Sequence, residues 1–189
     1  MKINQEKYDK EYYDDAYNYD VNTEEIHPGL IGCVIQTATQ LTFNLSPKSV
    51  LDVGCGLGHL VVAFRKMGVK AEGFDFSLDA DKYRISGARR HCWVQAADED
   101  INKKYDLITC IEVAEHLIDS QCMTMIKNMC GAANYICFSS SPDNLTEETH
   151  INVKTPGEWD LIFFSHGFRA LRNLGLCPHW AVLYERIAK

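Results

Sequence analysis

The residues with the clearest potential for chemistry are glycines and an aspartate in the N-terminal half of the chain. Directly after the apolar residues 49–53 come Gly54, Gly56 and Gly58. Glycines after a buried strand let the backbone turn tightly and approach a ligand without a Cβ in the way. Asp52 precedes this turn, where its carboxylate would repel a pyrophosphate and attract an ammonium group. The pattern therefore predicts a ligand-binding turn that favours a cationic group.

A second acid lies at the end of the next predicted strand. Asp75 follows residues 69–74, about 20 residues beyond the glycine turn, where an acid accepts hydrogen bonds from ribose hydroxyls. Phe76 comes next and offers an apolar neighbour for an adenine ring. His59 occupies the third small position of the dinucleotide fingerprint, and no Gly-Lys-Ser/Thr follows as a P-loop requires. Both of these nucleotide motifs are therefore disfavoured.

Two histidines are placed to remove a proton from an acceptor molecule. His116 follows the apolar residues 105–111, and His150 lies in a polar connection, residues 140–154. Imidazole is the usual general base near neutral pH. His116 has an alternative role as a helix-start residue bonded to the backbone. His150 stands in an irregular loop, where functional residues concentrate, and we predict that both histidines are catalytic.

Alternating strand-like and helix-like segments would position these residues. The predicted strands are residues 49–53, 69–74, 92–97, 105–111, 132–139, 169–173 and 181–187. The predicted helices are residues 29–43, 57–67, 77–90 (with Ser77 as N-cap), 115–130 and 156–166. This order predicts a doubly wound α/β fold with a mainly parallel, seven-stranded Rossmann-like sheet, helices on both faces and an antiparallel C-terminal strand. The ligand crevice then lies at the carboxyl ends of the first strands.

Residues 1–28 differ from the rest of the chain. They are polar, acidic and unlike a secretory leader, and we expect an irregular N-terminal arm before a single domain of residues 29–189. Five tyrosines are concentrated in the arm: Tyr8, Tyr12, Tyr13, Tyr17 and Tyr19. Two interpretations remain open. The arm is either an aromatic lid, with Tyr13 facing the cofactor, or a segment whose rings pack on the body.

Charge and hydropathy narrow the class of partner. The formal net charge is −7, and the densest basic group, Arg84, Arg89 and Arg90, is small. Because nucleic-acid-binding surfaces present clustered Lys and Arg, we disfavour nucleic acid and expect a small-molecule acceptor. No apolar run approaches the length that spans a bilayer. We expect no membrane partner and a cytoplasmic location, and the sequence leaves the oligomeric state open.

The cysteine spacing indicates neither a disulfide framework nor a zinc site. The chain has eight, none in a C-x-x-C pair, and most lie in apolar runs such as residues 108–111 and 135–138. We therefore expect buried free thiols in a reducing cytoplasm rather than disulfides or a zinc site.

In combination these segments resemble the class I S-adenosylmethionine (SAM)-dependent methyltransferases, in particular small bacterial type 11 and type 23 enzymes. Residues 50–60 resemble motif I of that family, and residues 71–77 resemble its acidic ribose motif. Residues 95–98 are similar to the segment whose acid, here Asp98, contacts the adenine amino group. Residues 105–117 resemble the strand-four motif beside the methyl donor.

The resemblance implies SAM as cofactor and methyl transfer to a hydroxyl or amine of a small molecule. It is reinforced by residues 149–168, which are similar to a segment of bacterial methyltransferases acting on sugars and other natural products. The cofactor-binding residues that it implies are Tyr13, Asp52, Gly54, Cys55, Gly56, Gly58, Asp75, Phe76, Asp98, Ile111 and Glu112. For Asp98 a second interpretation stays open, because residues 98–100 are also a typical acidic helix start.

Two other functions remain as alternatives. One alternative comes from a resemblance to the metal-binding E-x-x-E-H set of small-RNA 3′-terminal 2′-O-methyltransferases. The residues concerned are Glu112, Glu115, His116 and the distant His150. Such ligands hold Mg²⁺ or Mn²⁺ over a vicinal diol. However, the same pattern follows strand four in relatives without a metal, and the acidic chain disfavours RNA, so we expect no metal. The second alternative is a non-catalytic subunit that binds SAM and scaffolds a partner.

Overall fold

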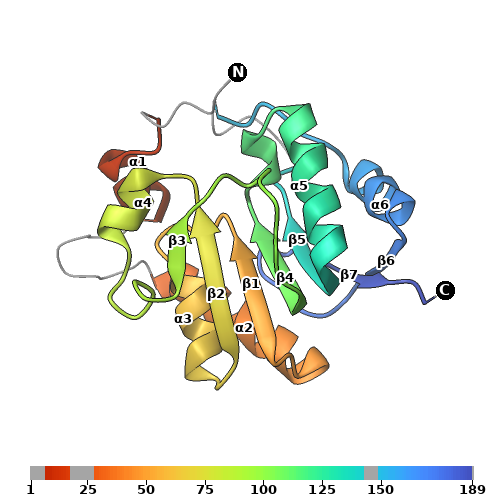
Figure 1. Ribbon diagram of the computed structural model, residues 1–189, viewed down its shortest axis with the longest axis horizontal. Helices are drawn as coiled ribbons and strands as arrows, with labels where there is room; N and C mark the ends of the chain where they lie inside the picture. The colour runs from red at the N-terminus through yellow and green to blue at the C-terminus, as the bar shows by residue number, and fades with distance from the viewer. Residues whose placement is uncertain (1–6, 18–27, 143–148, 189) are drawn as a thin grey trace.

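The computed structural model describes residues 7–17, 28–142 and 149–188. In this part of the chain seven strands form one sheet in the order β3-β2-β1-β4-β5-β7-β6 (Figure 1). The strands are β1 (Ser49–Val53), β2 (Lys70–Asp75), β3 (Cys92–Val94), β4 (Tyr105–Ile111), β5 (Ala133–Ser139), β6 (Phe168–Leu171) and β7 (Val182–Arg186). The first five pair in parallel, and β7 runs antiparallel to both β5 and β6. The predicted mixed sheet is confirmed.

Helices cover both faces of this sheet (Figure 1). They are α1 (Lys10–Tyr17), α2 (Pro28–Leu45), α3 (His59–Lys66), α4 (Leu78–Tyr83), the 3₁₀ turn η2 (Ala114–His116), α5 (Asp119–Ala132) and α6 (Pro156–Ser165). One hydrophobic core joins α5 and α6 to the sheet, and a second joins α2 and α3 to the opposite face. Neighbouring residues of β4 divide between the two: Leu107 packs with the second core and Ile108 with the first. Burial on both faces explains why these strands read as continuous apolar runs.

The N-terminal arm is more regular than its composition predicts. Residues 10–17 form α1, so the expectation of an irregular arm is wrong there. The Asp9 carboxylate accepts a hydrogen bond of 3.0 Å from the Tyr12 backbone N–H, which satisfies a free donor at the start of the helix. Tyr8 and Tyr13 are buried in a third, small core with Leu57. Pro28, assigned to the arm, instead begins α2.

Other helix and strand ends also differ from the prediction. Ser77 is the N-cap of α4 as predicted, accepting a hydrogen bond of 3.0 Å from the Ala80 N–H, but this helix ends at Tyr83 rather than at residue 90. The predicted strand over residues 92–97 is formed only over residues 92–94. The predicted helix over residues 115–130 is divided into η2 and α5. The first two elements are therefore shorter at their carboxyl ends than predicted, whereas residues 117–118 interrupt the third.

One cysteine pair contradicts the expectation of free thiols. Cys33 of α2 and Cys177 of the loop between β6 and β7 form a disulfide, although 144 residues separate them. Their Cα atoms lie 5.2 Å apart because the fold brings that loop beside α2. The other six cysteines are free, and all of them except Cys92 are buried. The prediction was therefore wrong for this pair, and the cytoplasmic location stays a prediction.

Within the described ranges, no helix combines the length and the apolar character needed to cross a membrane.

Candidate active site

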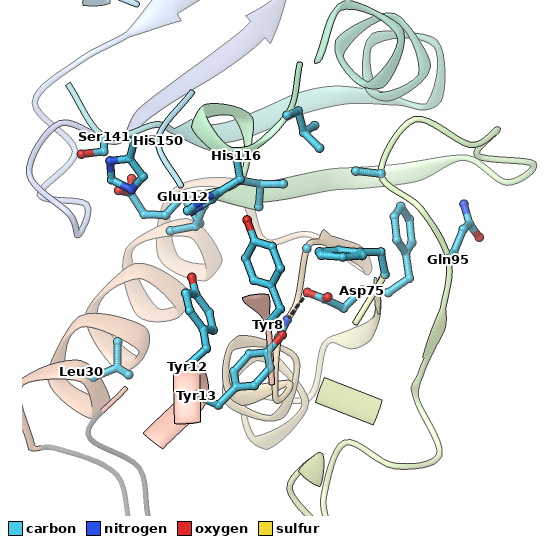
Figure 2. Close-up of a pocket in the computed structure, with 18 of the residues that line it drawn as sticks. Tyr8, Tyr12, Tyr13, Leu30, Asp75, Gln95, Glu112, His116, Ser141 and His150 are labelled. Carbon is cyan, nitrogen blue, oxygen red and sulfur yellow. Dashed lines mark hydrogen bonds between the residues drawn. The ribbon is translucent and has the colours of Figure 1, made fainter. Parts of the chain in front are cut away.

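A cavity of about 410 Å³ opens at the carboxyl ends of β1, β2 and β4 (Figure 2). Gly54 and Gly56 line it after β1, Asp75 lines it at the end of β2, and Ile111 and Glu112 line it at the end of β4. Parallel strands end at the same edge of the sheet, so residues distant in sequence meet there. The cavity therefore lies where the order of elements predicts the crevice.

Two physical requirements explain why the turn after β1 contains glycines: positive φ angles and close packing. Gly54, Gly56 and Gly58 all have positive φ, at 72°, 49° and 87°, which L side chains rarely adopt. A Cβ on Gly54 would lie 2.4 Å from Val113 Cγ2, and one on Gly58 would lie 2.4 Å from Ala88 Cβ. Gly58 is not among the described residues that line the cavity. Backbone conformation and packing explain why residue 58 is a glycine. The predicted role of Gly58 toward the cofactor stays a prediction.

Asp75 connects the glycine turn to the next strand. One carboxylate oxygen accepts a hydrogen bond of 2.9 Å from the Gly56 N–H, and the other accepts one of 2.9 Å from the Ser77 N–H. Burial raises the pKa of this carboxyl, while these two N–H groups and the Arg84 guanidinium oppose that rise. Arg84 is itself buried and forms an ion pair of 2.6 Å with Asp81. The sequence showed Arg84 only as one of several scattered cations.

Asp52 is buried behind the turn rather than in the main cavity. Only 4% of its surface is exposed, and Oδ1 accepts a hydrogen bond of 2.6 Å from the Thr109 hydroxyl. Burial raises its pKa to about 7. Asp52 and Cys55 line a smaller cavity of about 100 Å³, which shares Gly54 and Ile111 with the main one. Neither predicted residue lines the main cavity, so their roles toward the cofactor stay predictions.

The two predicted catalytic histidines meet at the cavity. The ring centroids of His116 and His150 are 5.0 Å apart. The polar connection reaches this position because the backbone N–H groups of Ile151 and Asn152 donate to the Glu115 carbonyl, at 2.8 and 3.0 Å. His116 lies in η2, where its backbone N–H donates to the Val113 carbonyl at 3.1 Å.

Glu115, which precedes His116 in η2, is fully buried. One carboxylate oxygen accepts a hydrogen bond of 2.9 Å from the Ser141 N–H. One ligand atom each from Glu115, His116 and His150 lies within 4.8 Å of the others, so the three could hold a metal ion. Burial, with the neighbouring Glu112 carboxylate, raises the pKa of Glu115 to about 8. Glu112 borders this group and lines the cavity itself, but it is not one of the three.

Tyrosines of the arm form another wall of the cavity. Tyr8, Tyr12 and Tyr13 all line it, and Figure 2 shows them on the same side. The Tyr8 ring contacts Phe76 edge to face with centroids 5.0 Å apart. The Ser77 hydroxyl donates to the Tyr8 carbonyl at 3.0 Å, which ties the arm to the end of β2. The structure therefore places Tyr13 at the cavity; Tyr19 and the Tyr17 side chain lie outside the described part.

The cavity wall near residues 95–98 differs from the residue assignment made by resemblance. Gln95 and Ala97 line the cavity, whereas Asp98 is not among its described lining residues. The Asp98 backbone carbonyl accepts a hydrogen bond of 3.2 Å from Asn128 of α5. Its cofactor role stays a prediction without support from this geometry. The resembling segment did contain Gln95, but no local signal distinguished it from its neighbours.

Three further lining residues had no signal in the sequence. They are Leu30 of α2, Ser141 after β5 and Trp180 before β7. Trp180 donates its indole N–H to Glu112 Oε1 at 2.9 Å, and the Ser139 hydroxyl donates to the same oxygen at 2.6 Å. Tertiary folding, rather than any local sequence pattern, brings Leu30, Ser141 and Trp180 to the site.

The chain is similar to known proteins both in sequence and in structure. A family model described as "Methyltransferase domain" matches residues 32–173. A ubiquinone biosynthesis O-methyltransferase of Coxiella burnetii (strain Dugway 5J108-111) is 40% identical over 92 residues, covering 45% of this chain and 38% of the relative. The same enzyme of Pseudomonas fluorescens (strain SBW25) is 32% identical over 97 residues, covering 44% and 42%. The chain thus spans less than half the length of these curated relatives.

Solved structures share the fold at low identity. Magnesium protoporphyrin IX methyltransferase from Synechocystis PCC 6803, with bound S-adenosylhomocysteine (SAH), matches with a TM-score of 0.68 and 18% identity, covering 94% of this chain and 97% of that one. The sugar N-methyltransferase KedS8 from Streptoalloteichus sp ATCC 53650 matches with a TM-score of 0.67 and 9% identity, covering 84% and 88%. At such identities the likeness shows the architecture alone.

Proposed function

Since the chain belongs to the class I SAM-dependent methyltransferases, through the methyltransferase-domain family that matches residues 32–173, we propose that it methylates a hydroxyl group of a small molecule. The observation that carries the proposal is the histidine pair, His116 and His150, at the cavity that Asp75 also lines. Figure 2 shows His150 on one side of the cavity and Asp75 and Gln95 on the other. One end would bind the nucleoside and the other would receive the acceptor.

At the nucleoside end the residues bind and orient. The Asp75 carboxylate would accept hydrogen bonds from the ribose hydroxyls, in addition to those it receives from Gly56 and Ser77. Phe76 and Gln95 would border the adenine ring, the first through its apolar face and the second through its amide. Bound SAM supplies a methyl group on a sulfonium, which is already electrophilic. Alignment is therefore the main task of this end.

At the acceptor end the task is to remove a proton. A hydroxyl must lose its proton as its oxygen forms the new bond to the methyl carbon, and an imidazole nitrogen can take that proton. The carbon–sulfur bond breaks in the same step, so that SAH would leave with a neutral sulfur. Both His116 and His150 line the cavity, so either imidazole is placed to accept this proton. The O-methyltransferases among the similar sequences support an oxygen acceptor. An amine acceptor, as in the sugar N-methyltransferase, comes second.

The first test is calorimetric titration of the purified chain with SAM, SAH and NAD. We expect micromolar binding of both sulfur ligands and none of NAD. Transfer of a radioactive methyl group from SAM to a panel of phenols and sugars then identifies the acceptor class. Binding without transfer to any acceptor would favour the non-catalytic subunit instead, and an absence of SAM and SAH binding would contradict the proposal.

One observation favours a second candidate, metal-assisted transfer. Besides the three converging ligand atoms, the Glu115 carboxyl is fully buried beside the Glu112 carboxyl. A bound cation would offset the repulsion between these two neighbouring carboxylates. Glu115, His116 and His150 would hold the ion, which would lower the pKa of an acceptor hydroxyl bound to it. Activity that is lost with EDTA and restored by Mg²⁺ or Mn²⁺ would establish this candidate; activity unchanged by EDTA would remove it.

We also propose that residues 1–28 contribute a lid to a catalytic domain of residues 29–189. Support comes from the tyrosines of the arm that line the cavity and from the hydrogen bond between Ser77 and the Tyr8 carbonyl. Aromatic rings at this position would exclude water from bound SAM.

A further inference from the structure

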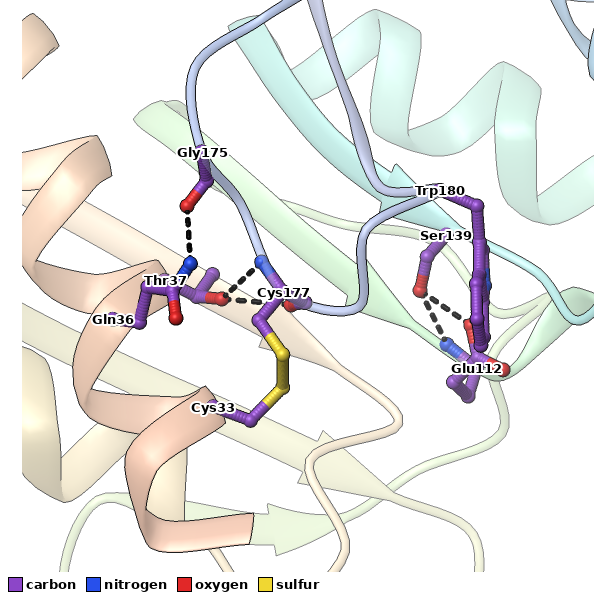
Figure 3. Close-up of a disulfide and its surroundings, with 8 residues drawn as sticks. All are labelled: Cys33, Gln36, Thr37, Glu112, Ser139, Gly175, Cys177 and Trp180. Atoms are coloured by element: carbon purple, nitrogen blue, oxygen red, sulfur yellow. Dashed lines mark hydrogen bonds between the residues drawn. A yellow bond between two sulfur atoms is a disulfide. The ribbon is translucent and has the colours of Figure 1, made fainter. Parts of the chain in front are cut away.

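Trp180 reaches the site from the far end of the chain. It lies in the loop between β6 and β7, residues 172–181, and lines the main cavity. Its indole N–H donates to Glu112 Oε1 at 2.9 Å, and the Ser139 hydroxyl donates to the same oxygen at 2.6 Å (Figure 3). Hydrogen bonds to a charged acceptor are stronger than neutral ones. Two such donors fix the direction of the Glu112 carboxylate.

The backbone of Glu112 is also specialised. Its φ is 55°, in the left-handed region that a non-glycine residue adopts only when its surroundings hold it there. The Glu112 N–H donates to the Ser139 carbonyl and hydroxyl, each at 3.2 Å. This conformation comes directly after β4, at the wall of the cavity. The strain is consistent with a side chain that is placed for a ligand.

The loop that carries Trp180 is fastened to α2. The Cys33–Cys177 disulfide joins them covalently. Beside it the Thr37 hydroxyl donates to the Cys177 carbonyl at 2.7 Å and accepts from the Cys177 N–H at 3.2 Å. Figure 3 shows the disulfide and these bonds on one side and Trp180 with its glutamate on the other. Because α2 also contributes Leu30 to the cavity, the disulfide joins two of its walls.

We propose that Trp180 is a positioning residue, which holds the Glu112 carboxylate toward the sulfonium of bound SAM, and that the Cys33–Cys177 disulfide keeps the loop of Trp180 in place. This inference rests on the proposed function of the same cavity. A fixed carboxylate attracts a cation strongly where water is excluded. SAH has a neutral sulfur, so the carboxylate contributes to binding of SAM and not to binding of SAH. The preference of the protein for SAM over SAH is therefore the quantity that Trp180 controls.

The test compares the two dissociation constants in variants, measured by calorimetry. Trp180→Phe keeps an aromatic ring and removes the donor, and we expect SAM to bind about fivefold more weakly, the scale of one ordinary hydrogen bond, with SAH nearly unchanged. Ser139→Ala removes the other donor to the same oxygen and should change the ratio in the same direction. Tyr135→Phe is the matched control, because it removes a hydrogen bond of 3.0 Å to Glu185 away from the cavity. Thermal unfolding of each variant verifies that it is folded.

The disulfide is tested separately. Dithiothreitol reduces the sulfur–sulfur bond with two electrons and two protons and becomes its own cyclic disulfide. We expect the reductant to raise the SAM dissociation constant of the wild type about threefold. A change of this size is within the range expected when one hydrogen bond is weakened. The double variant Cys33→Ser/Cys177→Ser should show this weaker binding without reductant and no response to it.

The outcomes separate the inference from the proposed function. Wild type that binds neither SAM nor SAH would contradict the proposed function, and the inference with it. If wild type binds both ligands, an equal loss of affinity for SAM and SAH in Trp180→Phe would show that Trp180 only lines the cavity. That result would overturn the inference. An unchanged SAM dissociation constant in that variant would overturn it as well. A reductant that affects wild type and the double serine variant equally would remove the disulfide from the proposal.

Discussion

Replacing Asp52 with asparagine separates the effect of its buried charge on stability from its effect on the cofactor. The carboxylate is 4% exposed and has the Thr109 hydroxyl as its hydrogen-bond donor, at 2.6 Å. Asparagine has nearly the same shape, and its carbonyl oxygen can accept the same bond. The substitution therefore removes the charge and leaves the packing largely intact.

The magnitude follows from the pKa of this carboxyl. Burial raises it from 3.8 to about 7. Between these two pH values the folded state holds a proton that the unfolded state has lost, so this group makes stability fall as pH rises. A shift of about three units corresponds to about 4 kcal/mol. At pH 8 we expect Asp52→Asn to be more stable than wild type by about 2 to 4 kcal/mol, with the difference vanishing near pH 4.

Urea unfolding of both proteins at a series of pH values measures this difference. Carboxyls that do not interact with Asp52 titrate alike in both proteins and cancel when the two curves are subtracted, whereas Asp75, whose charge raises the pKa of Asp52, contributes part of the difference. A variant that is less stable than wild type at pH 8, or a difference that does not change with pH, would refute the reasoning. In the same samples at pH 8, SAM binding should weaken, because the ionised carboxylate attracts the ammonium of the methionine moiety. Stronger binding by the variant would exclude that role.

Three further predictions concern the cavity. Asp75→Ala should weaken binding of both SAM and SAH at least about tenfold, through lost bonds to ribose and to the Gly56 turn, whereas the exposed control Asp100→Ala should bind as wild type does in the same calorimetric titration. His150→Gln should leave SAH binding unchanged and lower the rate of methyl transfer by about a hundredfold or more if this imidazole is the base; an unchanged rate would assign the proton to another group. Deleting residues 1–20 should weaken SAM binding about fivefold through the lost contacts of Tyr8 and Tyr13, and unchanged binding and kinetics would remove the lid.

Local sequence was sufficient for the part of the cavity formed by the glycine turn and Asp75. The β1 strand is a short apolar run, and Gly54 and Gly56 follow it because the turn demands positive φ. Asp75 lies at the end of the next strand, and parallel pairing brings it beside the turn. These relations depend on residues close in sequence or on strands that pair in order. The β4 strand, residues 105–111, was predicted to the residue for the same reason.

The part of the cavity around the histidine pair was decided by tertiary structure. The sequence predicted His116 and His150 separately, and only the fold of the connecting loop onto Glu115 brings their rings together. Trp180 and the Cys33–Cys177 disulfide had no signal at all, because each depends on a loop that returns to the site from the last strands. Periodicity reports which face of an element is buried, but it contains no information on the path of a loop. The glycine turn and Asp75 were therefore readable from spacing, whereas the walls around the histidine pair and Trp180 depend on contacts between segments distant in sequence: 68 residues separate Trp180 from Glu112, and 144 separate the two cysteines of the disulfide.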